Sequence, residues 1–288
     1  MKICLGEGFQ FGQYTFEDAM DAISKIGYDH VELLNGGAHL DPNAPDDQIK
    51  EKAKVMDHYG IKPAAVLGGG PLASLDSETR RQAVKGFNRQ IVVARLLGCD
   101  YITSEMNGGT SLQLNDCIDA FKASMREVAP VLEGEGVQAS FEAHPGDFVE
   151  DNNLGVDIIK EIGHKSIGYL YCGPHTFILG EDPAAMIEYA ADVLNWVHIA
   201  DSYREERIII SFAPMGYATV GGTPEFKDTR GHLHLVPGEG EVDFASIFRT
   251  LKKIGYDGFV SAIPFDSITP VEAVTQSLKM IQKYISES

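Results

Sequence analysis

The chain has 288 residues, of which 44 % are hydrophobic, and its 24 basic and 42 acidic side chains give a formal net charge of −18. The hydrophobic fraction excludes an intrinsically disordered chain, and the acidic surface argues against nucleic acid or an anionic membrane as the main partner. The length fits a single α/β barrel, so we expect one domain over residues 1–288.

Cysteine usage and the apolar runs indicate the compartment. The four cysteines match neither a CxxC pair nor a disulfide framework, which favours a reducing environment. The first residues lack the apolar core of a signal peptide, and no run of about 18 apolar residues offers a membrane span. We therefore expect a cytoplasmic protein.

Short apolar runs alternate with longer helical patterns along the chain. The predicted strands are 3–8, 30–34, 62–70, 100–106, 137–144, 167–175, 195–202 and 258–263. The predicted helices are 15–28, 45–60, 76–98, 114–136, 154–164, 182–194, 242–256 and 269–285, the first with Thr15 as N-cap. Eight strand–helix units in this order predict a closed (β/α)8 TIM barrel. A doubly wound open sheet is the alternative, which the absence of GxGxxG after the first strand weakens.

A long connection without a helical period, residues 203–241, follows the seventh predicted strand. Loops of this length are typical of lids and binding loops. Its place after a strand assigns it to the face where barrels carry their active sites. An arm for contact between subunits is the alternative.

Acidic and imidazole side chains recur at the predicted C-terminal strand ends, which meet at one mouth of a barrel. They are Glu7, Glu32, Glu105, Glu142, His144, Cys172, His175, His198 and Asp201, joined by His232 and His234 from the long connection. Such a mixture suits Mn²⁺, Zn²⁺ or Co²⁺ better than Mg²⁺. Each residue alone has a structural explanation, such as a strand-end ion pair, but together they predict a metal or polyol site.

Five segments along the chain form a recognisable set: GYDHVELL, FEAHPG, CGPHTFILGEDP, WVHIADS and VPGEGEVDFASIFRTLKKIGYDGFVSAI. Together they resemble the xylose isomerase-like TIM barrel family, which includes sugar-phosphate isomerases and epimerases. The resemblance covers nearly the whole chain and implies metal ligands at the ends of strands five to eight. It assigns Glu142 and His198 directly, whereas Cys172 stands where an aspartate is usual and Ile263 where a second glutamate is usual.

The resemblance implies a metal-dependent sugar or keto-polyol isomerase or epimerase, or a related dehydratase. A proton is removed next to a metal-polarised carbonyl. The expected metal ligands are Glu142, Cys172, His198 and His234, and the thiolate favours zinc. Ile263 cannot transfer a proton, which argues against an epimerisation that uses two glutamates. The sequence therefore favours elimination of water over epimerisation. The expected catalytic residues are Glu142, Glu105 and His144, and the expected substrate contacts are His175, Asp201, His232 and Arg230.

Two other functions stay open at this point. One is a non-catalytic or partner-dependent sugar-binding barrel with a degenerate metal site. The other is a DNA-repair nuclease of the same fold, which the acidic charge opposes. The expected partner is a small-molecule sugar or polyol, with no nucleic acid and no membrane. We also expect a homo-oligomer, because barrels of the resembled family often pair.

Overall fold

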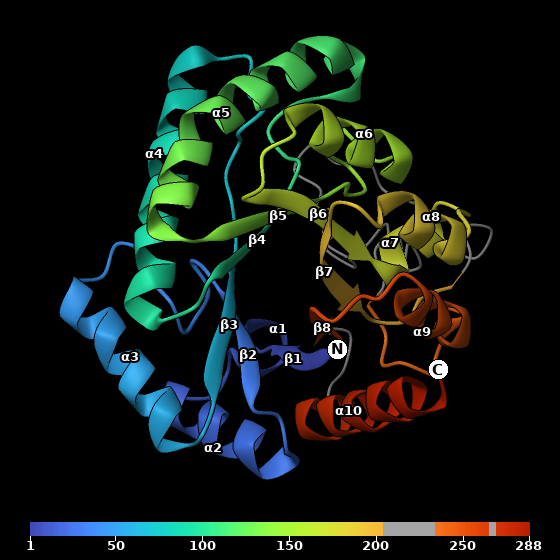
Figure 1. The fold of residues 1–288 in the computed structure, drawn as a ribbon. Coiled ribbons are helices and arrows are strands. Elements are labelled where there is room, and N and C mark those ends of the chain that lie inside the picture. The colour runs from blue at the N-terminus through green and yellow to red at the C-terminus, as the bar shows by residue number, and fades with distance from the viewer. Residues whose placement is uncertain (204–233, 265–268) are drawn as a thin grey trace, which may run out of the picture.

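Eight parallel strands form a closed barrel in which each strand pairs with the next and the last pairs with the first (Figure 1). The computed structural model describes residues 1–203, 234–264 and 269–288. The strands are β1 (Lys2–Gly6), β2 (His30–Leu34), β3 (Lys62–Leu67), β4 (Tyr101–Glu105), β5 (Gln138–Glu142), β6 (Ile167–Cys172), β7 (Leu194–Ile199) and β8 (Phe259–Ala262). The predicted (β/α)8 barrel is confirmed, and the open sheet is excluded.

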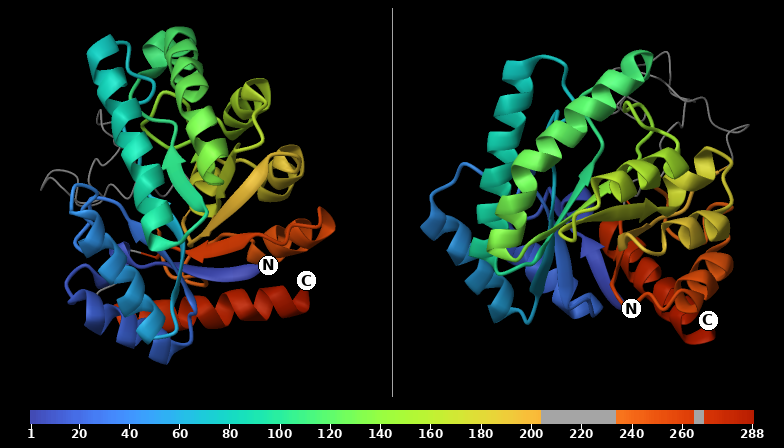
Figure 2. Two further views of the ribbon diagram at one scale, coloured as in Figure 1. Left: turned by 60° about the vertical axis from the view of Figure 1, so that its left-hand side comes forward. Right: turned by 45° about the horizontal axis from the view of Figure 1, so that its top comes forward.

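Helices surround the barrel on its outside, as two further views show (Figure 2). They are α1 (Gly8–Phe11), α2 (Phe16–Ile26), α3 (Asp46–His58), α4 (Ser77–Leu97), η1 (Ser111–Gln113), α5 (Leu114–Glu135), α6 (Asn152–Ile162), α7 (Gly173–Ile178), α8 (Pro183–Ala190), α9 (Phe244–Lys253) and α10 (Pro270–Glu287). Their apolar faces pack on the outer face of the sheet and form the main core. Among the described helices, none combines the length and the apolar character needed to cross a bilayer.

Local signals explain where α2 begins and ends. The Thr15 side chain accepts a hydrogen bond from the backbone N–H of Asp18 at 3.2 Å, so the predicted N-cap is confirmed. Gly27 ends the helix with φ of 110°, a left-handed conformation that favours glycine.

Two predicted strands are shorter than expected because the chain turns into a short helix. The runs 3–8 and 167–175 were both expected to be extended, but α1 begins at Gly8 and α7 at Gly173. In α7, Pro174 lies in the first helical turn, where its missing N–H is not needed. The Thr176 hydroxyl donates to the Cys172 carbonyl at 2.9 Å. His175 therefore lies on the short helix that directly follows β6 in the chain.

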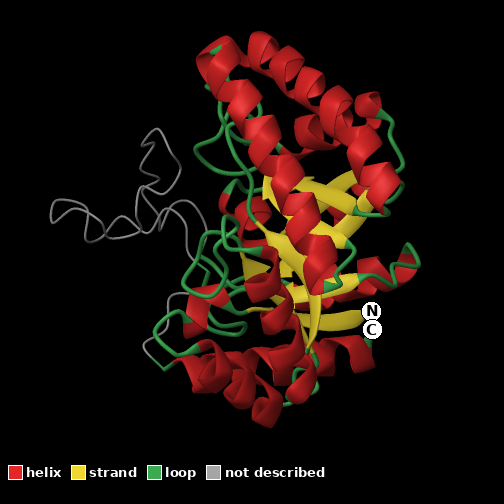
Figure 3. Cartoon of the chain, turned by 90° about the vertical axis from the view of Figure 1, so that its left-hand side faces the viewer, coloured by secondary structure: helices red, strands yellow, loops and turns green. Residues whose placement is uncertain are grey.

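Aromatic side chains fill the barrel interior near the N-terminal strand ends. The Trp196 ring stacks on Phe259 with centroids 5.0 Å apart and lies 5.4 Å from the Tyr101 ring. These residues belong to a second apolar cluster, separate from the main core. The polar groups lie at the opposite end, at the C-terminal mouth where barrels carry their active sites. Figure 3 shows most of the longer loops at that end, away from both termini.

Candidate functional site

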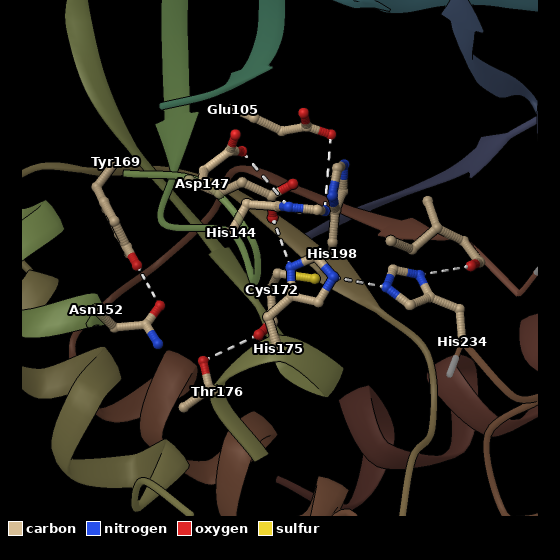
Figure 4. Close-up of polar contacts among 12 residues, drawn as sticks. Glu105, His144, Asp147, Asn152, Tyr169, Cys172, His175, Thr176, His198 and His234 are labelled. Atoms are coloured by element: carbon tan, nitrogen blue, oxygen red, sulfur yellow. Dashed lines mark hydrogen bonds and ion pairs between the residues drawn. The ribbon is translucent and has the colours of Figure 1, made fainter. Parts of the chain in front are cut away.

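Carboxylate, imidazole and thiol groups gather at the C-terminal mouth of the barrel (Figure 4). We call these residues the mouth cluster: Glu105, Glu142, His144, Asp147, Cys172, His175, His198 and His234. They form four overlapping groups of three, and the possible ligand atoms of each group lie within 4.8 Å of one another. The structure thus brings together side chains that the sequence analysis placed at the ends of separate strands.

One group of three joins neighbouring strands. Glu142 is the last residue of β5, Cys172 is the last residue of β6, and His198 lies on β7 opposite Cys172 in the parallel register. All three side chains are buried. A carboxylate oxygen, a sulfur and a ring nitrogen therefore converge within 4.8 Å, a donor set that a divalent transition metal accepts.

The electrostatics of this group fit a bound cation. Burial, reinforced by the charge of Glu105, raises the pKa of Glu142 well above its usual range. Burial and the charge of Glu142 likewise raise the pKa of the Cys172 thiol. A divalent ion would supply the positive charge that favours the carboxylate and the thiolate. Glu142 and Cys172 therefore suit a metal site in both geometry and charge.

His234 reaches the end of β8, where the side chain of Ile263 contributes no polar atom. The His234 Nδ1 lies 3.2 Å from the Ile263 carbonyl oxygen. Because a carbonyl only accepts, Nδ1 carries the proton. The His234 Nε2 lies 2.9 Å from the Nε2 of His175, whose Nδ1 is 3.4 Å from Glu142 Oε2. A line of polar contacts thus runs from the backbone of β8 to the carboxylate that ends β5.

His144 lies between two carboxylates, those of Glu105 and Asp147. Its Nε2 is 3.8 Å from Glu105 and its Nδ1 is 3.5 Å from Asp147. Burial, and then the charge of Glu105, raise the pKa of Asp147 to about 9. Asp147 was not among the predicted site residues. The HPGD sequence could have indicated it, because a turn with proline and left-handed Gly146 at its centre brings the first and fourth residues together.

Glu32 was expected among the polar strand ends, but no ligand, catalytic or substrate role was predicted for it. It lies on β2 inside the barrel, where its carboxylate accepts hydrogen bonds from the hydroxyls of Thr103 and Ser261. The Nε2 of His198 lies 3.1 Å from each of its oxygens. Burial opposes the charge of Glu32, but His198 and the two hydroxyls outweigh it and lower its pKa. Glu32 therefore contacts His198 from inside the barrel and is not itself part of the mouth cluster.

Asp201 has a structural role in place of the substrate contact that the sequence suggested. Its carboxylate is buried and accepts four backbone N–H bonds, one from the next residue and three from the segment 238–242. Its backbone pairs with Leu235 in both directions, at 2.8 and 2.9 Å. Asp201 thereby holds the segment that carries His234. Two further predicted substrate contacts, Arg230 and His232, lie outside the described residues.

Glu7 lies after the end of β1 but does not join the mouth cluster. It is fully buried and pairs with Nδ1 of His39 at 2.7 Å. The His39 Nε2 contacts the carbonyl of Tyr14 at 2.9 Å. The hydrogen bond with Glu7 raises the pKa of His39. Among the described residues, neither Glu7 nor His39 belongs to one of the four ligand groups.

Several known proteins of similar sequence carry enzyme names. Inosose isomerase of Bacillus velezensis is 21 % identical over 264 residues, which cover 91 % of this chain and 87 % of the relative. Inosose dehydratase of Geobacillus kaustophilus is 22 % identical over 262 residues, which cover 86 % of this chain and 79 % of the relative.

Solved structures share the fold over the whole chain. The structure of L-ribulose 3-epimerase superposes with a TM-score of 0.78 at 20 % identity, covering 100 % of this chain and 95 % of that one. The IOLI protein with a bound zinc atom has a TM-score of 0.77 at 18 % identity, covering 100 % and 99 %. The family model described as xylose isomerase-like TIM barrel matches residues 20–284. The chain therefore belongs to the xylose isomerase-like TIM barrel family.

Proposed function

We propose that this protein is an enzyme that isomerises, epimerises or dehydrates a sugar or keto-polyol, with a divalent metal ion held by Glu142, Cys172 and His198. The observation that carries the proposal is the convergence of their oxygen, sulfur and nitrogen atoms within 4.8 Å at the barrel mouth. The names of the relatives, inosose isomerase and inosose dehydratase, support this substrate class.

The donor set favours zinc over manganese or cobalt, because a thiolate is a softer ligand than the aspartate usual at the end of strand six. His234 is our candidate for the fourth ligand, at the position left by the glutamate that Ile263 replaces. When bound, the ion polarises a substrate carbonyl and makes the neighbouring C–H more acidic.

Glu105 and His144 are our candidates for the base that takes the carbon-bound proton. The Glu105 side chain is 18 % exposed, so a substrate in the mouth can reach it, and His144 lies beside it. We place His175 against a substrate hydroxyl, and Arg230 and His232 also remain proposed substrate contacts.

Elimination of water fits this arrangement better than a two-carboxylate epimerisation, because Ile263 offers no acid or base on the β8 side. The base removes the proton, and the electron pair of the C–H bond forms the carbon–carbon double bond. The hydroxyl on the next carbon then leaves with a proton from His175, as water. One base and one acid are sufficient for this sequence.

The test combines metal analysis with an assay of proton removal. Purified protein loaded with zinc, manganese or cobalt is incubated with inososes and ketoses in D₂O, and NMR follows deuterium exchange next to the carbonyl and loss of water. We expect Glu142→Gln to lose both bound metal and turnover. Glu135→Gln, a substitution of an exposed glutamate at the end of α5, should change neither. Undiminished turnover of Glu142→Gln with the metal still bound would contradict the proposal.

One observation favours a second candidate, a sugar-binding barrel without turnover. Ile263 is buried in an apolar cluster at a position where the family usually carries a glutamate. If the wild-type protein takes up no metal but binds a sugar in calorimetry, this second function replaces the first.

A further inference from the structure

We propose that Glu32 is a positioning residue that fixes the tautomer of His198 and so directs its Nδ1 toward the metal. The inference rests on the metal site of the proposed function. It goes beyond that site because Glu32 is not itself a proposed metal ligand, and acts from β2 through its contact with His198.

The distances show which atom carries the proton. The Nε2 of His198 lies 3.1 Å from Oε1 and 3.1 Å from Oε2 of Glu32. A protonated carboxyl donating to nitrogen would bring Nε2 close to a single oxygen. Equal distances fit one N–H that is shared by two acceptors, so the proton is on Nε2.

Two buried hydroxyl groups hold the Glu32 carboxylate in its position against His198. Thr103 donates its hydroxyl to Oε1, and Ser261 donates to Oε2 at 2.7 Å. Both hydroxyls are fully buried, and they come from β4 and β8. Two strands therefore hold the carboxylate in place. Each of its oxygens can still accept a second hydrogen bond, from Nε2 of His198.

A neutral imidazole with its proton on Nε2 has a lone pair on Nδ1. Nδ1 is thus the nitrogen that His198 offers to the group with Glu142 and Cys172. Carboxylates that accept from the far nitrogen of a metal-binding histidine fix its orientation and increase its basicity, and their loss typically weakens metal binding about 10- to 100-fold.

The experiment measures two quantities: the tautomer of His198 in the metal-free protein, and the affinity of the protein for zinc. Long-range ¹H–¹⁵N NMR of the metal-free wild-type protein, labelled at histidine, should show the His198 proton on Nε2. Glu32→Gln keeps the shape but presents an NH₂ group, so part of the His198 population should move its proton to Nδ1. Zinc affinity, measured by competition with a chromophoric chelator, should fall about 10- to 100-fold.

Glu7→Gln is the matched control. Glu7 is also a fully buried glutamate that pairs with a histidine, but His39 lies outside the mouth cluster. This variant should leave the His198 tautomer and the zinc affinity unchanged. If Glu32→Gln does not fold, Ser261→Ala removes one of the groups that hold Glu32 and should cause a smaller loss of zinc affinity.

Two results would overturn the inference: a proton on Nδ1 of His198 in the metal-free wild type, or zinc binding by Glu32→Gln as tight as that of the wild type. Failure of the proposed function has a different signature. In that case wild type and Glu7→Gln both bind no zinc, while the NMR spectrum still decides the tautomer.

Discussion

Replacing Asp201 by asparagine tests how the segment after β7 is held at the barrel mouth. Oδ1 of Asp201 accepts backbone N–H bonds from Ser202 and Val242, at 2.9 and 3.0 Å. Oδ2 accepts from Gly238 and Gly240, at 2.8 and 2.9 Å. The side chain is buried, so solvent does not replace a lost acceptor.

The size of the stability loss follows from the fact that each carboxylate oxygen accepts two backbone N–H groups. Asparagine keeps one oxygen and replaces the other by an NH₂ donor. Whichever way the amide is turned, two backbone N–H groups face a donor and lose their acceptor. A buried donor without a partner costs about 1–3 kcal/mol. We expect Asp201→Asn to lower the free energy of unfolding by about 3 kcal/mol, in the lower half of the summed range because a buried charge is removed at the same time.

Urea unfolding followed by circular dichroism measures the change. Asp243→Asn is the control, because Asp243 is exposed and caps α9 through a hydrogen bond from the Ser246 N–H at 3.0 Å. Asparagine caps helices as well as aspartate does, so this variant should match the wild type. A loss below about 0.5 kcal/mol for Asp201→Asn, the size of an ordinary surface substitution, would refute the assigned role.

Three further predictions concern pH, metal preference and helix stability. The hydrogen bond with Glu7 raises the pKa of His39 above 6.5. The stabilisation of the folded protein by protonated His39 is therefore complete below pH 6.5 and is lost as the pH rises through the raised pKa. The difference in unfolding free energy between wild type and His39→Gln should therefore shrink over that range, and a constant difference would contradict this. Cys172→Asp should shift metal preference from zinc toward manganese in competition experiments, and an unchanged preference would show that the thiol is not a ligand. Gly86 lies inside α4 with open space at its Cβ position, so Gly86→Ala should stabilise the protein by about 1 kcal/mol in thermal melts, and a lower melting temperature would count against this.

Much of the fold was predictable because its signals are local. Each helix pattern, the Thr15 cap and the glycine that ends α2 are read from neighbouring residues. Parallel strands align their C-terminal ends, so the order of the elements predicted that Glu142, Cys172 and His198 would lie close together. The strand ends near α1 and α7 were less accurate, since a short helix after a strand has too few residues to show a period.

What the sequence by itself determined is therefore the barrel and most of the polar side chains at its mouth. Only the tertiary structure decided what each of these side chains contacts. Glu32 and His198 are separated by 166 positions, and Asp201 meets the backbone of a segment that lies beyond the long connection. Such contacts depend on depth inside the barrel and on the exact direction of each side chain. The alternation of residue types along a strand indicates which side chains face inward, but it carries no information about their partners across the barrel.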